Sequence, residues 1–214
     1  MEEKIILIRH GQSIGNLNRV YLGHTNLDLS ERGYRQAKSF SDFFVENYKV
    51  DKIYSSDLIR AYNTVVPVAE NLNLEIVKDK NLREIYAGLW ENQEFDSLAV
   101  KFKDTYGKWL TDIGNAGCDG GETVRELKDR IINRLYEIAE ENPGKDILIG
   151  THATPIRIVK CIFSGLPLDE MHNVEWAYNA SLTHLTYENG KFEIKDYNIH
   201  SYLGEVVKFP SSKV

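Results

Sequence analysis

Short apolar segments alternate with amphipathic segments along this chain, and that alternation limits the folds open to it. The first apolar segment covers residues 4–8 (Lys-Ile-Ile-Leu-Ile), others follow at 51–54 and 146–150, and a weaker one lies at 74–77. Each has the length and composition of a buried parallel strand. Between these segments, apolar side chains recur at helical spacing. This spacing predicts helices at about 31–46, 57–72 (bent or interrupted at Pro67), 95–113, 122–142 and 155–163.

The end of the chain follows a different pattern. Residues 181–187 alternate between apolar and polar side chains and meet residues 191–197 through Glu188-Asn189-Gly190. Asn-Gly between two such segments is a strong hairpin signal. Strands that alternate with helices predict an α/β sheet with crossover helices, and the hairpin adds at least one antiparallel strand. No internal repeat or linker divides the 214 residues, so we expect one domain.

Basic side chains follow three of the expected strands. Arg9 and His10, in the triplet Arg9-His10-Gly11, come directly after the first strand. Arg60 lies just beyond the second strand, and His152 follows the third. Because ligands bind at the carboxyl ends of strands in open α/β sheets, these side chains are expected at one sheet edge. Arginine binds two phosphate oxygens and keeps its charge, so the set predicts a site for phosphoryl transfer.

Composition excludes several other functions. The net charge of −6 argues against a protein that mainly grips nucleic acid. No apolar run reaches the roughly 18 residues of a membrane span, and two cysteines are too few for a disulfide framework. We therefore expect a cytoplasmic protein with neither nucleic acid nor membrane as partner. Neither a metal-ligand cluster nor a nucleotide-binding glycine motif occurs, so no metal and no cofactor are expected.

Several motifs, in order, resemble those of the histidine phosphatase superfamily, which contains cofactor-dependent phosphoglycerate mutases and their phosphatase relatives. The resemblance covers nearly the whole chain. It rests on Arg9-His10-Gly11-Gln12-Ser13 with Asn16, on residues 23–30 with Gly33, Gln36 and Ala37, on Ser55-Ser56-Asp57-Leu58 with Arg60, Ala61 and Thr64, on Leu82-Arg83-Glu84 with Gly88, Trp90 and Glu91, and on Gly120-Gly121-Glu122-Thr123 with His152.

The resemblance implies a role for each matching residue. His10 would be the nucleophile that becomes a phosphohistidine, and Glu84 the general acid that protonates the leaving oxygen. Neutral imidazole is a competent nucleophile near neutral pH, and Glu84, once deprotonated, can activate water. The remaining residues assigned to the phosphoryl group or the substrate are Arg9, Arg60, His152, Asn16, Gly23 and Ala153.

The resemblance also implies a fold and a partner. The expected fold is a three-layer α/β/α sandwich with a mostly parallel mixed sheet, formed by a single domain at 1–214 with a helical lid-like insertion at about 92–120. The expected partner is a small phosphorylated metabolite, and a homodimer is the assembly that general frequencies favour.

Three functions remain open at this point. Residues 84–91 resemble phosphatase-like members, and residues 95–113 lack the prolines of the mutase branch, so a phosphomonoesterase is favoured. A 2,3-bisphosphoglycerate-dependent phosphoglycerate mutase is the alternative. The unusual Ala153-Thr154 pair and the segment at 199–203 motivate a third reading, a non-catalytic protein that binds phosphorylated ligands.

Other residues have weaker claims to a function. We expect His184 to be structural, and His24, His172 and His200 have no partner at ligand spacing. Glu122 either caps the helix that follows or contacts substrate. Aromatic residues in such segments usually belong to the core, although they can line a pocket; they are Tyr21, Tyr86, Trp90, Tyr106 and Trp109.

Overall fold

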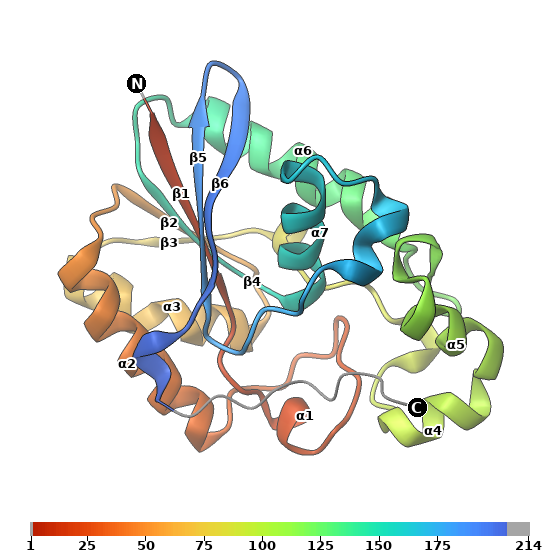
Figure 1. Ribbon diagram of the computed structural model, residues 1–214. Helices are drawn as coiled ribbons and strands as arrows, with labels where there is room; N and C mark the ends of the chain where they lie inside the picture. The colour runs from red at the N-terminus through yellow and green to blue at the C-terminus, as the bar shows by residue number, and fades with distance from the viewer. Residues whose placement is uncertain (1, 205–214) are drawn as a thin grey trace.

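The computed structural model describes residues 2–204 and contains a six-stranded sheet in the order β3-β2-β4-β1-β5-β6 (Figure 1). Strands β1 to β4 are mutually parallel, whereas β5 runs antiparallel to both β1 and β6. The strands are β1 (Glu3–Arg9), β2 (Lys52–Ser55), β3 (Ile76–Lys78), β4 (Ile147–Thr151), β5 (Leu182–Glu188) and β6 (Lys191–Ile199). The mostly parallel mixed sheet with its late hairpin is therefore confirmed.

Helices cover both faces of the sheet. They are α1 (Ile14–Leu17), α2 (Glu31–Asn47), α3 (Ile59–Leu72), α4 (Phe95–Lys101), α5 (Lys103–Thr111), α6 (Val124–Glu141) and α7 (Ala153–Phe163). Helices α2 and α3 lie on one face, and α6 and α7 lie on the other (Figure 1). Short 3-10 helices lie at Lys80–Leu82, Gly88–Trp90, Ile113–Asn115, Leu168–Asn173 and Ser201–Leu203. The predicted three-layer sandwich is confirmed.

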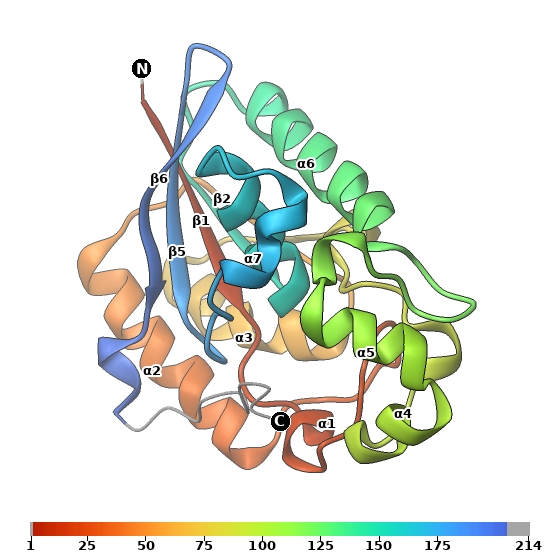
Figure 2. The same ribbon diagram turned by 45° about the vertical axis from the view of Figure 1, so that its right-hand side comes forward.

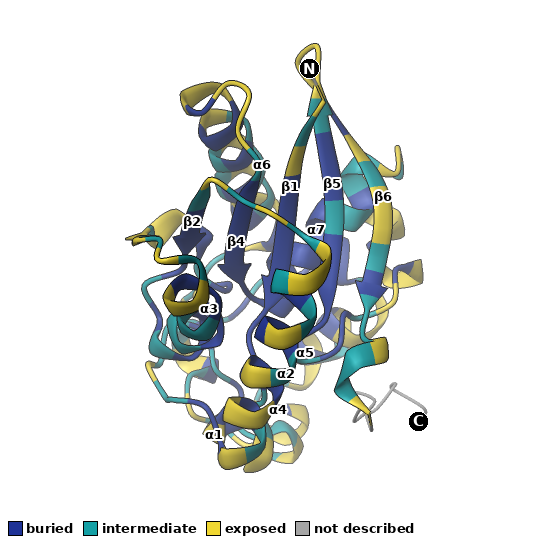
Figure 3. Ribbon diagram, turned by 90° about the vertical axis from the view of Figure 1, so that its left-hand side faces the viewer, coloured by how far each residue is buried: buried dark blue, intermediate teal, exposed yellow. Residues whose placement is uncertain are grey.

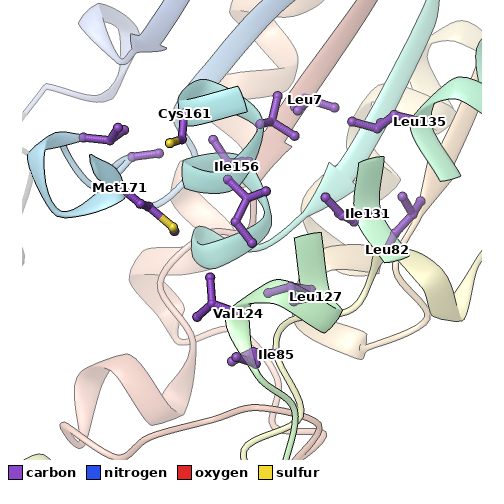
Figure 4. Packing of buried hydrophobic residues seen from close by; sticks show 14 of the residues in the cluster. Leu7, Leu82, Ile85, Val124, Leu127, Ile131, Leu135, Ile156, Cys161 and Met171 are labelled. Atoms are coloured by element: carbon purple, nitrogen blue, oxygen red, sulfur yellow. The ribbon is translucent and has the colours of Figure 1, made fainter. Parts of the chain in front are cut away.

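Alternate residues of β1 face two separate cores. Ile6 and Ile8 pack with Phe40 of α2, and Ile5 and Leu7 belong to the core on the other face. Figure 4 shows Leu7 in that second core among side chains of α6 and α7. Strands β1 and β4 are buried along nearly their whole length (Figure 3). Each fully buried aliphatic side chain of this kind stabilises the fold by about 1.5–3 kcal/mol.

Two helices differ from their predicted form. Helix α3 continues through Pro67 from Ile59 to Leu72, so the helix is not interrupted there, and a bend at Pro67 stays a prediction. Pro67 is only partly buried, whereas Val65 and Val68 are fully buried against the sheet and hold the helix in place. Helix α6 begins at Val124 because the Thr123 side chain accepts a hydrogen bond from the Glu126 amide in a capping box. Glu122 is therefore not its cap.

Helices α4 and α5 lie beside each other at one side of the molecule, where the lid-like insertion was expected (Figure 2). The fully buried Trp90 anchors this region. Its ring makes edge-to-face contacts with Tyr21, Tyr106 and Trp109, with centroids 5.4–5.8 Å apart. The core assignment of these aromatic residues is confirmed; movement of the insertion as a lid stays a prediction.

The unusual C-terminal segment is explained by packing up to the last described residue. Tyr202 stacks on Phe43 of α2 with centroids 4.5 Å apart, and its hydroxyl donates to the Ala180 carbonyl at 2.5 Å. This segment therefore packs against α2 and the residue pair that precedes β5. Residues 1 and 205–214 of the predicted domain lie outside the described residues. Within the described part of the chain, no helix is both long and apolar enough to cross a membrane.

Candidate active site

The ends of three parallel strands bring the predicted basic side chains to one sheet edge. Arg9 at the end of β1 is paired with Thr151 at the end of β4, and β4 in turn pairs with β2. The rings of His10 and His152 lie 5.2 Å apart between centroids. All four of Arg9, His10, Arg60 and His152 are buried, with at most 5% exposure. The structure thus gathers two guanidinium groups and two imidazoles in one buried cluster, which we call the phosphoryl pocket after the ligand predicted for it.

One hydrogen bond determines which ring nitrogen of His10 carries the proton. Nδ1 of His10 lies 2.7 Å from the Gly11 carbonyl oxygen. A carbonyl only accepts, so Nδ1 carries the proton and Nε2 of the neutral ring presents its lone pair. Burial, followed by the charges of Arg60 and Arg9, holds the pKa of His10 well below 6.5. The arrangement therefore keeps the His10 ring neutral with Nε2 unprotonated, and the role of His10 as a nucleophile stays a prediction.

The two guanidinium groups are held by main-chain carbonyls. Arg9 donates from Nη1 to the Ala177 carbonyl at 2.5 Å. Arg60 donates to the carbonyls of Thr25 and Gly23, each at 2.8 Å. Burial lowers the pKa of each arginine to about 10, and the charge of Glu84 opposes that shift. Both arginines stay protonated near neutral pH, so the pocket holds two fixed positive charges.

Glu84 is buried between its own segment and the start of α7. One carboxylate oxygen accepts from the Ile85 amide at 2.8 Å, and the other accepts from the Thr154 amide at 3.2 Å. Burial raises the pKa of Glu84 above its usual value, and the hydrogen bonds from Ile85 and Thr154 oppose the rise. Glu84 is thus a fixed carboxyl group that keeps its proton to higher pH than a solvated one does.

The Glu91 carboxylate, to which the sequence alone assigned no role, holds the segment around Gly23 by hydrogen bonds. Glu91 accepts from the amides of Gly23, His24 and Thr25 at 3.2, 2.6 and 2.9 Å. The same segment supplies the carbonyls that hold Arg60. A Cβ at Gly23 would come within 2.5 Å of the Ala87 amide nitrogen, so the close approach requires glycine. The N–H of Gly23 is bound to Glu91, and a role for Gly23 in binding substrate stays a prediction.

The main chain of Glu84 is fixed from two other elements. Its carbonyl accepts from Nε2 of His24 at 3.0 Å and from Arg130 of α6 at 3.1 Å. Arg130 also binds both carboxylate oxygens of Glu122, at 2.9 and 2.8 Å. Sequence reasoning missed Arg130, because nothing local distinguishes it from other charged residues of that helix.

Asn16 and Ala153 lie next to the phosphoryl pocket. Oδ1 of Asn16 accepts from the Ser13 amide and from Nδ2 of Asn179, both at 3.1 Å, so Asn16 has its amide NH₂ to offer to a ligand. Asn179 also donates to the His10 carbonyl at 3.1 Å. Ala153 is the first residue of α7, where the positive end of the helix dipole favours an anion. Their contacts with substrate stay predictions.

A cavity lies beside the segment that carries Glu84, and we call it the outer cavity. It has a volume of about 480 Å³ and is lined by His24, Tyr86, Gly121, Glu122 and Glu126. Its charged side chains are carboxylates. The Tyr86 side chain is 46% exposed, unlike the buried aromatic residues around Trp90. Among His24, His172 and His200, the side chain that lines the outer cavity is that of His24.

The other histidine side chains make their polar contacts outside the outer cavity. His172 and His200 each lie within hydrogen-bond distance of a main-chain carbonyl, those of Asp169 and Asn198. His184 lies on β5, with Nδ1 3.7 Å from the Asp196 carboxylate. Among residues 2–204, no group of three or more His, Cys, Asp or Glu side chains is arranged to hold a metal ion.

Comparison with known proteins identifies relatives over most of the chain. The sequence pattern of the "Histidine phosphatase superfamily (branch 1)" matches residues 5–200. Phosphoserine phosphatase 1 of Hydrogenobacter thermophilus is 30% identical over 205 residues, which cover 94% of this chain and 95% of that protein. Phosphoglycerate mutase-like protein 4 of Arabidopsis thaliana is 30% identical over 158 residues, covering 72% of this chain and 68% of that protein. The structure of Bacillus stearothermophilus YhfR superposes with a TM-score of 0.89 at 24% identity, covering 94% of this chain and 99% of that one.

Proposed function

This chain belongs to the histidine phosphatase superfamily, and on that premise we propose that it is a phosphomonoesterase in which His10 takes up the phosphoryl group of a small metabolite. The observation that carries the proposal is the hydrogen bond from Nδ1 of His10 to the Gly11 carbonyl. That bond leaves Nε2 as a nucleophile beside two buried guanidinium groups, Arg9 and Arg60.

In the first step Nε2 of His10 attacks phosphorus as the bond to the leaving oxygen breaks. The guanidinium groups of Arg9 and Arg60 stabilise the charge on the phosphoryl oxygens, and so does an N–H of His152. Glu84 gives its proton to the leaving oxygen, so the alcohol departs neutral and Glu84 becomes a carboxylate. The raised pKa of Glu84 suits this role because it keeps a larger protonated fraction.

In the second step the Glu84 carboxylate takes a proton from water, and the resulting hydroxide attacks phosphorus. The bond between phosphorus and Nε2 of His10 breaks, phosphate leaves, and both residues return to their starting states. The two arginines supply the positive charge that a divalent cation provides in other phosphoryl-transfer enzymes. We therefore expect turnover without added metal.

The charge of the outer cavity favours water as the acceptor over a second phosphorylated molecule. A mutase must also hold the second anionic group of a bisphosphorylated intermediate. The carboxylates of Glu122 and Glu126 would repel such a group, although the ion pair with Arg130 offsets the charge of Glu122. Relatives named phosphoserine phosphatase make phosphoserine the first substrate to test, and the mutase-like relative keeps mutase activity as the second candidate.

We propose that the protein is located in the cytoplasm, which is a reducing compartment. Cys118 and Cys161 are both free and buried, as thiols of proteins in a reducing environment commonly are.

The function is tested with the purified protein on a panel of phosphomonoesters in the presence of EDTA. The panel contains phosphoserine, sugar phosphates, nucleoside monophosphates and 3-phosphoglycerate, the last with and without 2,3-bisphosphoglycerate. We expect phosphate release from at least one member in EDTA, and its loss in His10→Ala. The control is His172→Ala, which changes an exposed histidine away from the pocket and should keep wild-type activity. Isomerisation of 3-phosphoglycerate that depends on the bisphosphate would favour the mutase instead, and full activity in His10→Ala would refute the mechanism.

A further inference from the structure

Ser56 lies directly after β2, within the phosphoryl pocket, and the mechanism above assigns it no role. Its side chain is fully buried. Its Oγ lies 2.9 Å from Nε2 of His152 and accepts from the Leu58 amide at 3.3 Å. Nδ1 of His152, on the other side of the ring from Ser56, is buried and has no hydrogen-bond partner among the described residues. The contact between Ser56 and His152 therefore leaves one ring nitrogen for a ligand.

Burial, followed by the charges of Arg60 and His10, holds the pKa of His152 well below 6.5, so the ring is neutral near pH 7. Two arrangements of protons on a neutral ring are compatible with this contact. In one, the Ser56 hydroxyl donates to Nε2 of His152, and the neutral ring carries its proton on Nδ1. In the other, Nε2–H donates to Ser56, and Nδ1 presents a lone pair. Each arrangement leaves one buried donor without an acceptor, and such a donor is costly. They differ in where that donor lies.

A bound phosphoryl group satisfies the donor in only one of these arrangements. If Nδ1 carries the proton, a phosphoryl oxygen bound next to His10 accepts it, since the two rings lie 5.2 Å apart. If Nε2 carries the proton, the Ser56 hydroxyl has no other acceptor among residues 2–204, and the lone pair on Nδ1 repels the phosphoryl oxygens. The Leu58 amide already donates to Ser56 and cannot accept.

We propose that Ser56 is a positioning residue that fixes the tautomer of His152, so that Nδ1–H meets the phosphoryl group. The proposal rests on the proposed phosphoryl transfer at His10. The two imidazoles then have opposite roles. The Gly11 carbonyl makes Nε2 of His10 a nucleophile, and the Ser56 hydroxyl makes Nδ1 of His152 a donor. Two neutral histidines are thus distinguished by their partners, a carbonyl in one case and a hydroxyl in the other.

The direct test is the tautomer of His152 in the wild-type protein. Long-range ¹H–¹⁵N correlation spectra of protein labelled with ¹⁵N-histidine distinguish a protonated from an unprotonated ring nitrogen. The His152 signals are assigned by their loss in His152→Gln. We expect a protonated Nδ1 and an unprotonated Nε2, with and without inorganic phosphate. A proton on Nε2 would overturn the proposal without any variant at Ser56. The spectrum does not depend on turnover, so a wrong tautomer is distinguishable from absent phosphatase activity.

Variants of the two adjacent serines give the second test. Ser56→Ala should move the His152 proton to Nε2 or produce a mixture, and should lower kcat roughly 10- to 100-fold, the range seen when a metal-bound histidine loses the hydrogen-bond partner that fixes its tautomer. Ser56→Thr keeps a hydroxyl and should restore the tautomer. The matched control is Ser55→Ala, because the Ser55 hydroxyl donates to the Ser56 carbonyl at 2.9 Å and not to His152. An unchanged His152 spectrum in folded Ser56→Ala would contradict the proposal.

Discussion

The phosphoryl pocket and the outer cavity lie next to each other, yet they are built differently. The phosphoryl pocket consists of side chains at or just beyond strand ends, with Arg60 in the first turn of α3, and they are at most 5% exposed and each held by a specific hydrogen bond. The outer cavity is lined by residues of loops and of the first turn of α6, and Tyr86 in it is 46% exposed. Glu84 lies between the two regions. Its carboxyl group is buried, and its main-chain carbonyl accepts a hydrogen bond from His24, which lines the outer cavity.

This difference separates the reaction from the choice of substrate. Rigid strand ends can hold charges where a phosphoryl group needs them, whereas loops change shape and side chains without disturbing the sheet. We therefore predict large losses of turnover from changes in the phosphoryl pocket, whatever the substrate. Changes in the outer cavity should have small effects that depend on the alcohol being released.

Glu84→Gln tests the residue between the two regions and should show the largest effect. The glutamine amide keeps a similar shape but has no acidic proton to give, so turnover of alkyl phosphates such as phosphoserine should fall roughly 100- to 10,000-fold. Release of p-nitrophenolate in the first turnover should fall far less, because this leaving group needs no protonation, whereas later turnovers slow on both substrates because Glu84 also activates water. The measurement is the rate of alcohol release in a single turnover on each substrate. Equal losses on the two would mean that Glu84 is not the general acid.

Arg60→Lys tests the pocket itself. The guanidinium of Arg60 is held by two carbonyls at once, and an ammonium group cannot reproduce that fork. We expect kcat/KM to fall about 100- to 1,000-fold on every substrate. Arg125→Lys is the matched control, since Arg125 lies on the surface in an exposed ion pair with Asp169. A loss confined to one substrate would place Arg60 in recognition of the alcohol.

The pH dependence of kcat/KM should reflect the buried pocket. Activity requires unprotonated His10, whose pKa lies well below 6.5, so activity should persist below that pH and fall as pH drops through this pKa. It also requires protonated Glu84, whose pKa is raised, so activity should fall about tenfold per pH unit as pH rises through that value. The basic limb should disappear in Glu84→Gln. An acid limb centred above pH 6.5 would contradict the assignment of His10.

Tyr86→Ala tests the outer cavity and should have the smallest effect. Loss of an aromatic contact should change KM for phosphoserine roughly two- to tenfold and leave kcat nearly unchanged. Tyr34→Ala is the control, since Tyr34 is 47% exposed on α2, outside the outer cavity. If Tyr86→Ala lowered turnover on all substrates as Arg60→Lys does, the two regions would not be separable.

The sequence predicted the residues whose position follows from the strands, and it missed those whose role depends on distant partners. Arg9, His10 and His152 could be predicted because each lies at the end of a strand or directly after it. Arg130 lies 46 residues from Glu84 along the chain, so only the folded chain shows that it binds the Glu84 carbonyl. Thr154 looked like a departure from the family, yet its main-chain amide makes the contact with Glu84, and any residue other than proline supplies that group.

Pro67 shows a second limit of sequence reasoning. Proline in a helix interior predicts a bend or an interruption, and which of the two occurs depends on how the rest of the helix is held. Here the fully buried residues of α3 pack on the sheet while Pro67 is partly exposed, and the helix is continuous. Likewise, the motif at 55–58 identified Ser56 as part of the resemblance, but its role depends on the proton of a histidine 96 residues away.

The central claim is that Nε2 of His10 carries the phosphoryl group during turnover. It is tested by mixing the protein with its best substrate, quenching in alkali within a single turnover, and locating the phosphoryl group by peptide mass spectrometry and by NMR of the phosphorylated ring. We expect one phosphoryl group, on Nε2 of His10, that is absent in His10→Ala. A phosphoryl group on Nδ1 or on any other residue would contradict the claim, and so would continued turnover by His10→Ala.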